Sequence, residues 1–356
     1  MTGFHGHPPD QTEGVPPARA VAGAAAALSR AGIGPARAEA EQLTAYALGV
    51  SRGRLALARE LDPAQQARLG ELVARRARRE PLQHLLGSTG FRYLELAVGP
   101  GVFVPRPETE LLAGWGVRAA RLAADRAEGP ALVVDLCSGT GAIALAVADE
   151  VPAARVIAVE RAASALKWLR RNADEWLRRN ADEWLRRNAD EWLRRNAAER
   201  AGGGVRPIEV VAGDVTDPAL LAELAGRVDV LLCNPPYVPA GTPVPPEVAE
   251  HDPAEAVFGG PDGLAVIRPV IDRAADLLRP GGLVGIEHDE SHAGRLPALF
   301  RARGRFDAVA EHPDLAGRAR FTIARRAGGA PGGTAGGAGG GTAASDAALA
   351  WQTGSS

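Results

Sequence analysis

The chain has 356 residues, of which 46% are apolar, enough for about two domains with hydrophobic cores. Its 41 lysines and arginines nearly balance its 43 acidic residues, which argues against a protein that holds duplex DNA mainly by neutralising phosphates. Two cysteines cannot form a disulfide scaffold or an all-cysteine zinc site. No apolar run reaches the ~18 residues that cross a bilayer, and the N-terminus lacks signal-peptide features. We therefore expect a cytoplasmic protein with no membrane insertion.

Both ends of the chain have a composition typical of disorder. Residues 1–16 and 327–356 are rich in Gly, Pro, Ala, Ser and Thr, with almost no apolar periodicity. They cannot offset the entropy lost on ordering, so we predict disordered tails. Residues 17–90 carry Ala, Leu and Arg at helical spacing, which predicts a small helical domain. Its helices should break at residues 32–35, 49–53 and 62–63.

The helical segment is basic although the whole chain is not. Residues 17–90 hold eleven arginines and six acidic residues, whereas the formal net charge of the chain is -2. One cluster consists of Arg75, Arg76, Arg78 and Arg79. A solvated helix face explains this cluster without any function, and a docking surface for an acidic partner is the alternative.

The pattern changes at Phe91. Apolar runs at 91–98 and 102–105 flank Gly99, Pro100 and Gly101, which predicts a β-hairpin linker within residues 91–108.

From residue 109 to 326, strand-like apolar runs alternate with helical stretches. This alternation predicts an α/β fold with a doubly wound, mostly parallel sheet, whose ligands bind beyond the carboxyl ends of the strands. The rule points to residues 135–141, Glu160, Asp214 and Asn234. We interpret six runs as strands: 131–137, 154–160, 208–214, 228–236, 283–288 and 320–325.

Residues 168–199 contain the octad Trp-Leu-Arg-Arg-Asn-Ala-Asp-Glu three times, and then once more with Ala in place of Asp. Acidic residues four positions before arginines favour one long helix, extended by the repeat. Successive copies are rotated by about 80°, so the tryptophans do not form a coiled-coil seam. A straight helix would leave the eleven-residue return at 197–207 almost no slack, so either the return is taut or the helix bends. The insertion is either a tandem expansion without function or an exposed Trp-rich interaction arm.

The run 133–141 is a strand that ends in a glycine-containing turn before a helix. Gly139 and Gly141 let the backbone approach a bound nucleoside, and the helix start supplies free amide donors. Glu160 lies nineteen residues after Gly141, where a carboxylate would bind the two ribose hydroxyls of an adenosine cofactor. The pattern predicts nucleoside binding, but it also fits the dinucleotide fingerprint, so the identity of the cofactor stays open.

The tetrapeptide Asn234-Pro235-Pro236-Tyr237 directly follows a predicted strand. An Asn side-chain oxygen and a backbone carbonyl at a proline-stiffened strand end can accept both N–H bonds of a planar amino or amide group, while a Tyr ring covers its face. This arrangement would turn the nitrogen lone pair toward an electrophile.

These residues resemble class I S-adenosylmethionine-dependent methyltransferases of the amino-group type, which carry Asn-Pro-Pro-Tyr after the fourth strand. More narrowly, the chain is similar to the release factor glutamine methyltransferase family, also called HemK or PrmC, over about residues 20–326 apart from the insertion. Three further blocks carry this resemblance: Pro-Leu-Gln-His-Leu-Leu-Gly at 81–87, Phe-Val-Pro-Arg-Pro-Glu-Thr-Glu at 103–110, and Gly-Gly-Pro-Asp-Gly-Leu at 259–264.

The resemblance implies a helical N-terminal domain at 17–90 for substrate recognition, a hairpin linker and a seven-stranded methyltransferase domain over residues 109–326. It implies an enzyme that uses S-adenosylmethionine to methylate N5 of the glutamine side-chain amide in the Gly-Gly-Gln motif. Class I peptide chain release factors, which carry that motif, are the implied partners. We further expect a monomer with no direct DNA binding.

The resemblance also implies roles for individual residues. The expected catalytic residues are Asn234, Pro235 and Tyr237, and the expected substrate site adds Pro236 and Phe103. Glu160 would hold the ribose, and Cys137 and Glu160 stand where the family commonly has Gly and often has Asp. The expected cofactor site comprises Asp135, Cys137, Ser138, Gly139, Thr140, Gly141, Glu160, Asp214, Val215 and Asn234.

The block at 105–110 also has a reading that needs no family. Pro105 and Pro107 favour an extended approach, and Glu108 and Glu110 suit the first turn of a helix. Helix capping is a sufficient explanation of the block, and contact of Phe103 or Arg106 with the cofactor or substrate is the alternative.

Two other clusters need weighing. His288 and His292 lie in a loop and lack the His-Glu-x-x-His order of helical zinc sites, so we expect no metal. Cys137 and Cys233 should lie about one strand spacing apart near the site, because the family's first and fourth strands are neighbours. They are either two small buried groups or a pair whose oxidation inhibits the enzyme.

Three other functions remain open at this point. A DNA or RNA adenine N6-methyltransferase shares both motifs but should carry a basic target-recognition region. A nicotinamide-dependent dehydrogenase shares the glycine fingerprint but does not explain the amide clamp. A non-enzymatic interaction protein built round the tryptophans would leave the whole site without use.

Overall fold

The computed structural model describes residues 14–126, 129–195 and 208–328, which belong to two compact units. One unit spans residues up to 88 together with 245–251, and the other spans 89–244 and 252 onward. Residues 1–13 and 329–356 of the two predicted tails lie outside the described residues. Within the described ranges, every helix is too short or too polar to cross a membrane.

The first predicted tail is wrong at its inner end. Val15 pairs with Leu61, with N–H···O distances of 3.0 and 2.8 Å in the two directions. This pairing satisfies both backbone groups of Val15 and fixes residues that composition alone assigns to disorder.

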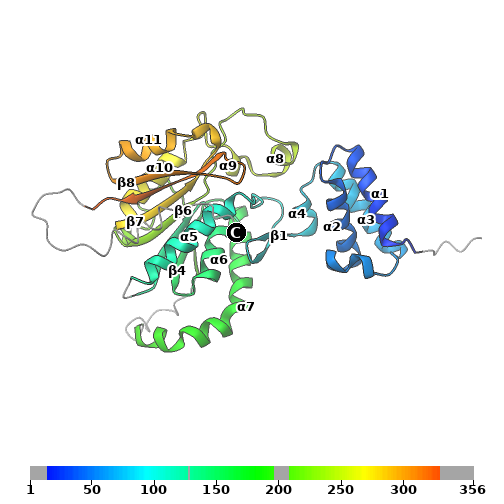
Figure 1. The fold of residues 1–356 in the computed structure, drawn as a ribbon, viewed down its shortest axis with the longest axis horizontal. Coiled ribbons are helices and arrows are strands. Elements are labelled where there is room, and N and C mark those ends of the chain that lie inside the picture. Colours follow the sequence, from blue (N-terminus) through cyan, green and yellow to red (C-terminus); the bar gives the residue numbers. More distant parts are fainter. Residues whose placement is uncertain (1–13, 127–128, 196–207, 329–356) are drawn as a thin grey trace, which may run out of the picture. The chain divides into compact units, whose positions relative to one another are not determined.

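The first unit is helical, as predicted. Asp62 and Gln65 form a reciprocal capping box at the start of one helix, and Gly49 ends another in the left-handed conformation, so the predicted breaks are correct there. Buried Leu28, Leu43 and Leu72 belong to its own core. Its helices are α1 (Pro17–Arg30), α2 (Ala36–Leu48), the 3₁₀ turn η1 (Arg52–Leu57), α3 (Pro63–Ala77), α4 (Leu82–Leu86) and α8 (Pro246–His251) (Figure 1).

The arginine cluster is not a solvated helix face at Arg76. This side chain is 6% exposed; its Nε donates to Glu39 at 2.6 Å and its Nη atoms donate to Glu247 of α8 at 3.1 Å. Arg75 pairs with Glu80, and Arg79 also pairs with Glu247. Periodicity could not predict this, because Glu247 lies 171 residues from Arg76.

The hairpin forms earlier than predicted, from β1 (Ser88–Phe91) and β2 (Leu94–Ala97) with its turn at Arg92 and Tyr93. Arg92 takes a φ of 52°, and its backbone N–H donates to Glu110 at 3.0 Å. The segment Gly99 to Gly101 instead serves packing: a Cβ on Gly99 would lie 2.6 Å from the Trp168 ring, whose Nε1 donates to the Pro100 carbonyl.

The second unit is built on a seven-stranded sheet in the order β5-β4-β3-β6-β7-β9-β8. The first five strands in this order are parallel, and β9 runs antiparallel to both β7 and β8. The α/β, mostly parallel sheet is therefore confirmed. The strands are β3 (Ala131–Leu136), β4 (Ala154–Glu160), β5 (Ile208–Ala212), β6 (Val228–Cys233), β7 (Leu278–Glu287), β8 (Phe306–Pro313) and β9 (Ala319–Arg326).

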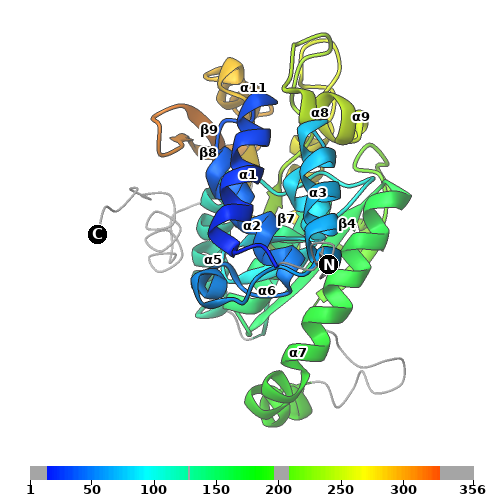
Figure 2. The same cartoon turned by 90° about the vertical axis from the view of Figure 1, so that its right-hand side faces the viewer.

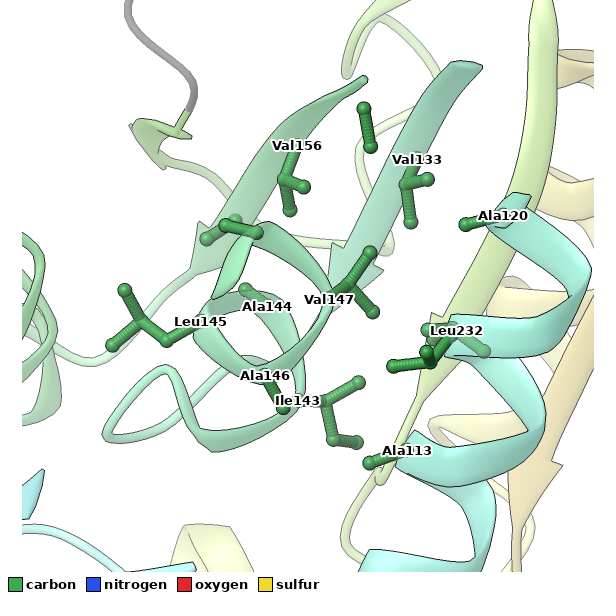
Figure 3. Packing of buried hydrophobic residues seen from close by; sticks show 14 of the residues in the cluster. Ala113, Ala120, Val133, Ile143, Ala144, Leu145, Ala146, Val147, Val156 and Leu232 are labelled. Atoms are coloured by element: carbon green, nitrogen blue, oxygen red, sulfur yellow. The ribbon is translucent and has the colours of Figure 1, made fainter. Parts of the chain in front are cut away.

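Helices cover both faces of this sheet. On one face, α5 (Thr109–Ala124) and α6 (Ala142–Glu150) pack their apolar side chains against Val133, Val156 and Leu232 (Figure 3). On the other, α10 (Ile267–Leu277) and α11 (Arg295–Ala302) pack against alternate residues such as Val134 and Leu231. The remaining short helices are η2 (Ala222–Leu224), α9 (Ala254–Val257) and η3 (Glu290–His292).

The octads lie in one long helix, α7 (Ala163–Arg195), so the helix prediction is correct as far as the structure describes it. Figures 1 and 2 show α7 changing direction along its length, which selects the bent alternative. Its first part belongs to the domain: Leu169, Asn172 and Trp176 are buried, and Trp176 Nε1 donates to Asp149 at 2.9 Å. Trp176 is therefore structural; the side chains of residues 181–195, and all of residues 196–199, lie outside what the structure describes.

Candidate active site

The segments singled out by the strand-end rule meet at one edge of the sheet. In the parallel pair β3 and β6, Leu136 lies opposite Cys233, so Cys137 and Asn234 follow at the same edge. Glu160 ends the neighbouring strand β4, and Asp214 follows β5 beyond it. Four segments spread over a hundred residues are thereby brought together.

The glycine turn has an unusual backbone. Cys137, Gly139 and Gly141 have φ values of 57°, 57° and 86°, in the left-handed region. A Cβ on Gly141 would lie 2.6 Å from the Leu169 side chain, whereas one on Gly139 would meet nothing within 4 Å. Gly141 therefore permits packing against α7, and Gly139 leaves open space for a ligand.

The polar side chains of the turn hold its shape. Ser138 Oγ donates to the Asp135 carbonyl at 2.8 Å, and the Gly141 N–H donates to the Ser138 carbonyl at 2.7 Å. Thr140 is 2% exposed. Asp135 is buried beneath the turn and accepts from the Ala144 N–H at 3.2 Å; burial raises its pKa to about 7.

The Glu160 side chain links the glycine turn after β3 to the backbone that follows β4. Its Oε2 accepts from the Gly139 N–H at 2.8 Å, while Oε1 accepts from the N–H groups of Arg161 and Ala162 at 2.8 Å each. The carboxylate is thus fixed directly beside the open glycine.

Asp214 lies near Glu160 and Gly139 and is half-buried. Burial acts to raise its pKa, but hydrogen bonds from Thr216 and Arg161 outweigh burial and hold the pKa below its usual value. Asp214 therefore stays ionised at neutral pH, and the following Val215 is buried.

The Asn-Pro-Pro-Tyr segment leaves β6 with both prolines buried and with Asn234 and Tyr237 half-buried. Asn234 Nδ2 donates to Thr109 Oγ1 at 3.1 Å, and Tyr237 Oη donates to Glu287 Oε1 at 3.1 Å. Burial raises the pKa of Tyr237, so its hydroxyl stays protonated. Thr109 and Glu287 are partners that sequence reasoning missed.

The block at 259–264 supports this segment from behind. A Cβ on Gly259 would lie 2.5 Å from the Pro236 carbonyl oxygen, and one on Gly263 would lie closer still to that of Tyr237. The Gly259 N–H donates to the Val238 carbonyl at 2.9 Å. Glycine is needed here because the two backbones touch.

The acidic residues of the 103–110 block do not cap helix α5 with their side chains. Glu108 makes no side-chain cap to α5, and Glu110 accepts from the Arg92 backbone instead. The Arg106 guanidinium lies over the half-buried Phe103 ring, 4.7 Å from its centroid, and pairs with Asp252 at 2.6 Å. Phe103 thus lies against Arg106, and the block's link to the site is Thr109.

The histidines of the 288–292 loop have structural partners. His288 Nε2 lies 3.0 Å from Thr322 Oγ1, and His292 Nε2 lies 3.0 Å from the Asp262 carbonyl oxygen. Both side chains are fully buried.

Comparison with known proteins agrees with this geometry. Residues 19–87 match the family described as the PrmC N-terminal domain. A release factor glutamine methyltransferase of Mycolicibacterium smegmatis is 47% identical over 307 residues, covering 86% of this chain and 96% of the relative. The chain belongs to the release factor glutamine methyltransferase family.

Members of this family are S-adenosylmethionine-dependent protein methyltransferases, and S-adenosylmethionine is the methyl donor of this enzyme. The residues at this edge of the sheet fit that cofactor. Gly139 faces open space, and the Glu160 carboxylate is fixed beside it. Asp214 lies close to Glu160, because it accepts a hydrogen bond from the neighbouring Arg161. Cys137 takes a left-handed φ of 57°, a conformation that glycine adopts more readily than other residues.

More distant similarities were also found. A Streptomyces pristinaespiralis protein named as a 4-amino-L-phenylalanine/4-methylamino-L-phenylalanine methyltransferase is 36% identical over 301 residues, covering 83% of this chain and 91% of that protein. A predicted O-methyltransferase structure from Agrobacterium tumefaciens is 19% identical, with a TM-score of 0.36, covering 59% of this chain and 81% of that one.

Proposed function

We propose that this enzyme methylates N5 of the glutamine side chain in the Gly-Gly-Gln motif of class I peptide chain release factors. The family membership and the N-terminal domain match support a release factor as substrate. The observation that carries the proposed chemistry is the Asn234 side chain, which directly follows β6 beside the glycine turn and binds Thr109 through Nδ2. Within the part of the chain that the structure describes, its Oδ1 has no hydrogen-bond donor, so it can accept from an N–H group.

In the proposed mechanism, the Asn234 Oδ1 and the Pro235 carbonyl oxygen accept hydrogen bonds from the two N–H groups of the substrate amide. Pro236 stiffens this backbone, and the Tyr237 ring covers one face of the planar group. An amide nitrogen is a poor nucleophile, because its lone pair is delocalised into the carbonyl. The protein therefore acts mainly by alignment, which can supply a large part of the rate enhancement.

The cofactor, when bound, supplies an electrophilic methyl group. We assign its methionine part to the turn at 137–141, above buried Asp135, its ribose to Glu160, and its adenine to Asp214 and Val215. Phe103 is assigned to the substrate side.

A radiolabelled methyl-transfer assay with a purified release factor tests the function. We expect label in the Gly-Gly-Gln protein and none in a Gly-Gly-Ala variant; equal labelling of both would refute the proposal. Free 4-amino-L-phenylalanine is the control for the activity named for the Streptomyces pristinaespiralis relative, and we expect no transfer to it.

Asn234→Ala tests the assigned clamp. Transfer should be abolished, while calorimetry should still detect S-adenosylmethionine binding, because the glycine turn and Glu160 remain. Near-normal turnover by this variant would contradict the role of Asn234.

We further propose that the enzyme works in the cytoplasm as a monomer and does not bind DNA directly. Light scattering at micromolar concentration tests the monomer, and a gel-shift assay with duplex DNA at physiological salt tests DNA binding. A dimer mass or a shifted band would contradict the respective statement.

A further inference from the structure

His292 is a buried histidine that the mechanism above does not use. It is the last residue of η3, and it is fully buried. Its Nδ1 atom is buried too and has no hydrogen-bond partner within the described ranges. Burying an unpaired polar atom costs free energy, so packing alone favours an apolar residue here. The contact made by the other ring nitrogen, Nε2, therefore accounts for the imidazole.

His292 Nε2 holds the glycine-rich loop at 259–264. It lies 3.0 Å from the Asp262 carbonyl oxygen, and a carbonyl oxygen can only accept, so Nε2 carries the hydrogen and donates it. The backbone of His292 is fixed as well, because its N–H donates to the Asp289 carbonyl at 2.9 Å. Asp289 in turn caps η3 by accepting from the Ser291 N–H at 2.9 Å. The loop is thus tied to a short helix that is itself well held.

The loop packs directly against the proposed amide clamp, residues 234–237. A Cβ on Gly263 would lie 2.7 Å from His292 Cε1 and closer still to the Tyr237 carbonyl oxygen, so Gly263 is packed against both. A Cβ on Gly259 would lie 2.5 Å from the Pro236 carbonyl oxygen. Closely packed groups transmit displacements, so a shift of the loop would move the backbone of the clamp.

Hydrogen bonds join the same two segments. Val238 directly follows the clamp; its N–H donates to the Val257 carbonyl at 3.0 Å, and its carbonyl accepts from the Gly259 N–H at 2.9 Å. The clamp backbone is therefore bonded to the start of the loop. Because the Pro235 carbonyl oxygen is the proposed acceptor for one substrate N–H, its position depends on this support.

We propose that His292 is a positioning residue for methyl transfer, which holds the 259–264 loop in place and, through this loop, the backbone carbonyls of the clamp. The inference rests on the proposed function and deepens it, because it identifies what keeps the Pro235 carbonyl oxygen aligned with the substrate amide. His292 itself does not touch the substrate. A small displacement of an aligning group is enough to slow a reaction that depends on alignment.

The first experiment compares His292 variants in methyl transfer to the release factor. His292→Leu fills the site but removes the donor, and it should lower kcat by about 10-fold. Its affinity for S-adenosylmethionine, measured by calorimetry, should stay within about twofold, because the glycine turn and Glu160 are unchanged. His292→Gln places an N–H donor at a similar reach and should restore most of kcat. Unchanged kcat in His292→Leu, or an equal loss in His292→Gln, would overturn the positioning role.

A shorter amide keeps the inference testable if His292→Leu fails to fold. His292→Asn carries the same amide group as His292→Gln on a side chain that is one methylene shorter, so it should not reach the Asp262 carbonyl. We expect it to be about 10-fold slower than the unaltered enzyme. Equal kcat values in the Asn and Gln variants would contradict the proposal, because the two differ in reach alone.

Amide hydrogen exchange measures the link from His292 to the clamp without any activity. The N–H groups of Val238 and Gly259 make the hydrogen bonds that join the clamp to the loop. Both should exchange several-fold faster in His292→Leu, since local opening becomes easier, and near the unaltered rate in His292→Gln. Unchanged exchange of these two amides in His292→Leu would refute the link.

Another buried histidine of the same unit serves as the matched control. His312 of β8 stacks on Phe321, with 5.0 Å between the ring centroids. His312→Leu also removes a buried imidazole and should leave kcat within about twofold; a loss equal to that of His292→Leu would contradict the proposal. Absence of transfer by the unaltered enzyme would overturn the proposed function and this inference with it, whereas full transfer by His292→Leu would overturn this inference alone.

Discussion

The side-chain amide of Asn172 donates a hydrogen bond of 3.0 Å to the carbonyl oxygen of Thr140, inside the glycine turn. The same side chain pairs with both backbone groups of Ala97, donating to its carbonyl at 3.0 Å and accepting from its N–H at 2.8 Å. Asn172 is 4% exposed. The first octad therefore fixes the glycine turn against the end of the hairpin.

We predict that Asn172→Ala destabilises the protein and weakens cofactor binding. The buried Thr140 carbonyl and two part-buried backbone groups of Ala97 would lose their partner, and a buried group left unsatisfied costs about 1–3 kcal/mol. Urea unfolding should show a loss in this range or above, and calorimetry should show weaker S-adenosylmethionine binding. Asn180→Ala is the control, because Asn180 is the same octad position one copy later and its Nδ2 binds the Trp176 carbonyl of its own helix. Equal effects of the two variants would contradict the link.

A second prediction concerns the octads themselves. Deleting residues 177–192 removes two copies and joins Trp176 to Leu193 in the register of the repeat. The deletion keeps the contacts of Trp168 to Pro100, Asn172 to Thr140 and Trp176 to Asp149. Transfer rate and stability should therefore stay near those of the full chain. Trp176→Ala in the full chain should instead cost about 3–5 kcal/mol in unfolding free energy, because it empties a buried site. A transfer rate lost on deletion would show that the extra octads act.

The parts of the fold that sequence could predict are local. The buried strands β3, β4 and β6 are mostly apolar runs, and the strand-end rule brings Glu160 and Asn234 to one edge without any knowledge of side-chain contacts. By contrast, β8 was missed, because only Phe306 and His312 among its residues are buried and its run is polar. The Gly-Pro-Gly segment does not form the turn of the hairpin as predicted: it follows β2, and Gly99 packs against Trp168, about 70 residues later.

The support of the site also escaped prediction for a physical reason. Thr109 binds Asn234 across 125 residues of chain, and Tyr237 binds Glu287 across 50. No periodicity encodes such pairs. Two signals were nevertheless present: a threonine within the 103–110 block, and one acidic residue directly after the apolar run 283–286.

A third prediction uses the buried ion network of the helical unit. Arg76→Met should destabilise this unit by about 3–5 kcal/mol, because Glu39 would remain buried with no counter-charge. Adding Glu39→Leu should recover much of the loss. Arg75→Met is the control: its partner is Glu80, its side chain is 46% exposed, and exposed pairs contribute about 0–1 kcal/mol. Urea unfolding followed by circular dichroism compares them, and equal losses for Arg75 and Arg76 would contradict the network's importance.

The last prediction decides between the two interpretations of the cysteine pair. Cys233 is fully buried, and burial, together with the neighbouring Cys137 thiol, raises the pKa of its thiol well above the usual value. A disulfide forms by thiolate attack, so a thiol kept neutral reacts slowly. Mild diamide at neutral pH should therefore leave the transfer rate unchanged, and thiol titration under denaturing conditions should still find both thiols. If diamide inhibited the enzyme, dithiothreitol restored it, and Cys233→Ser abolished the effect, the pair would be a working redox switch.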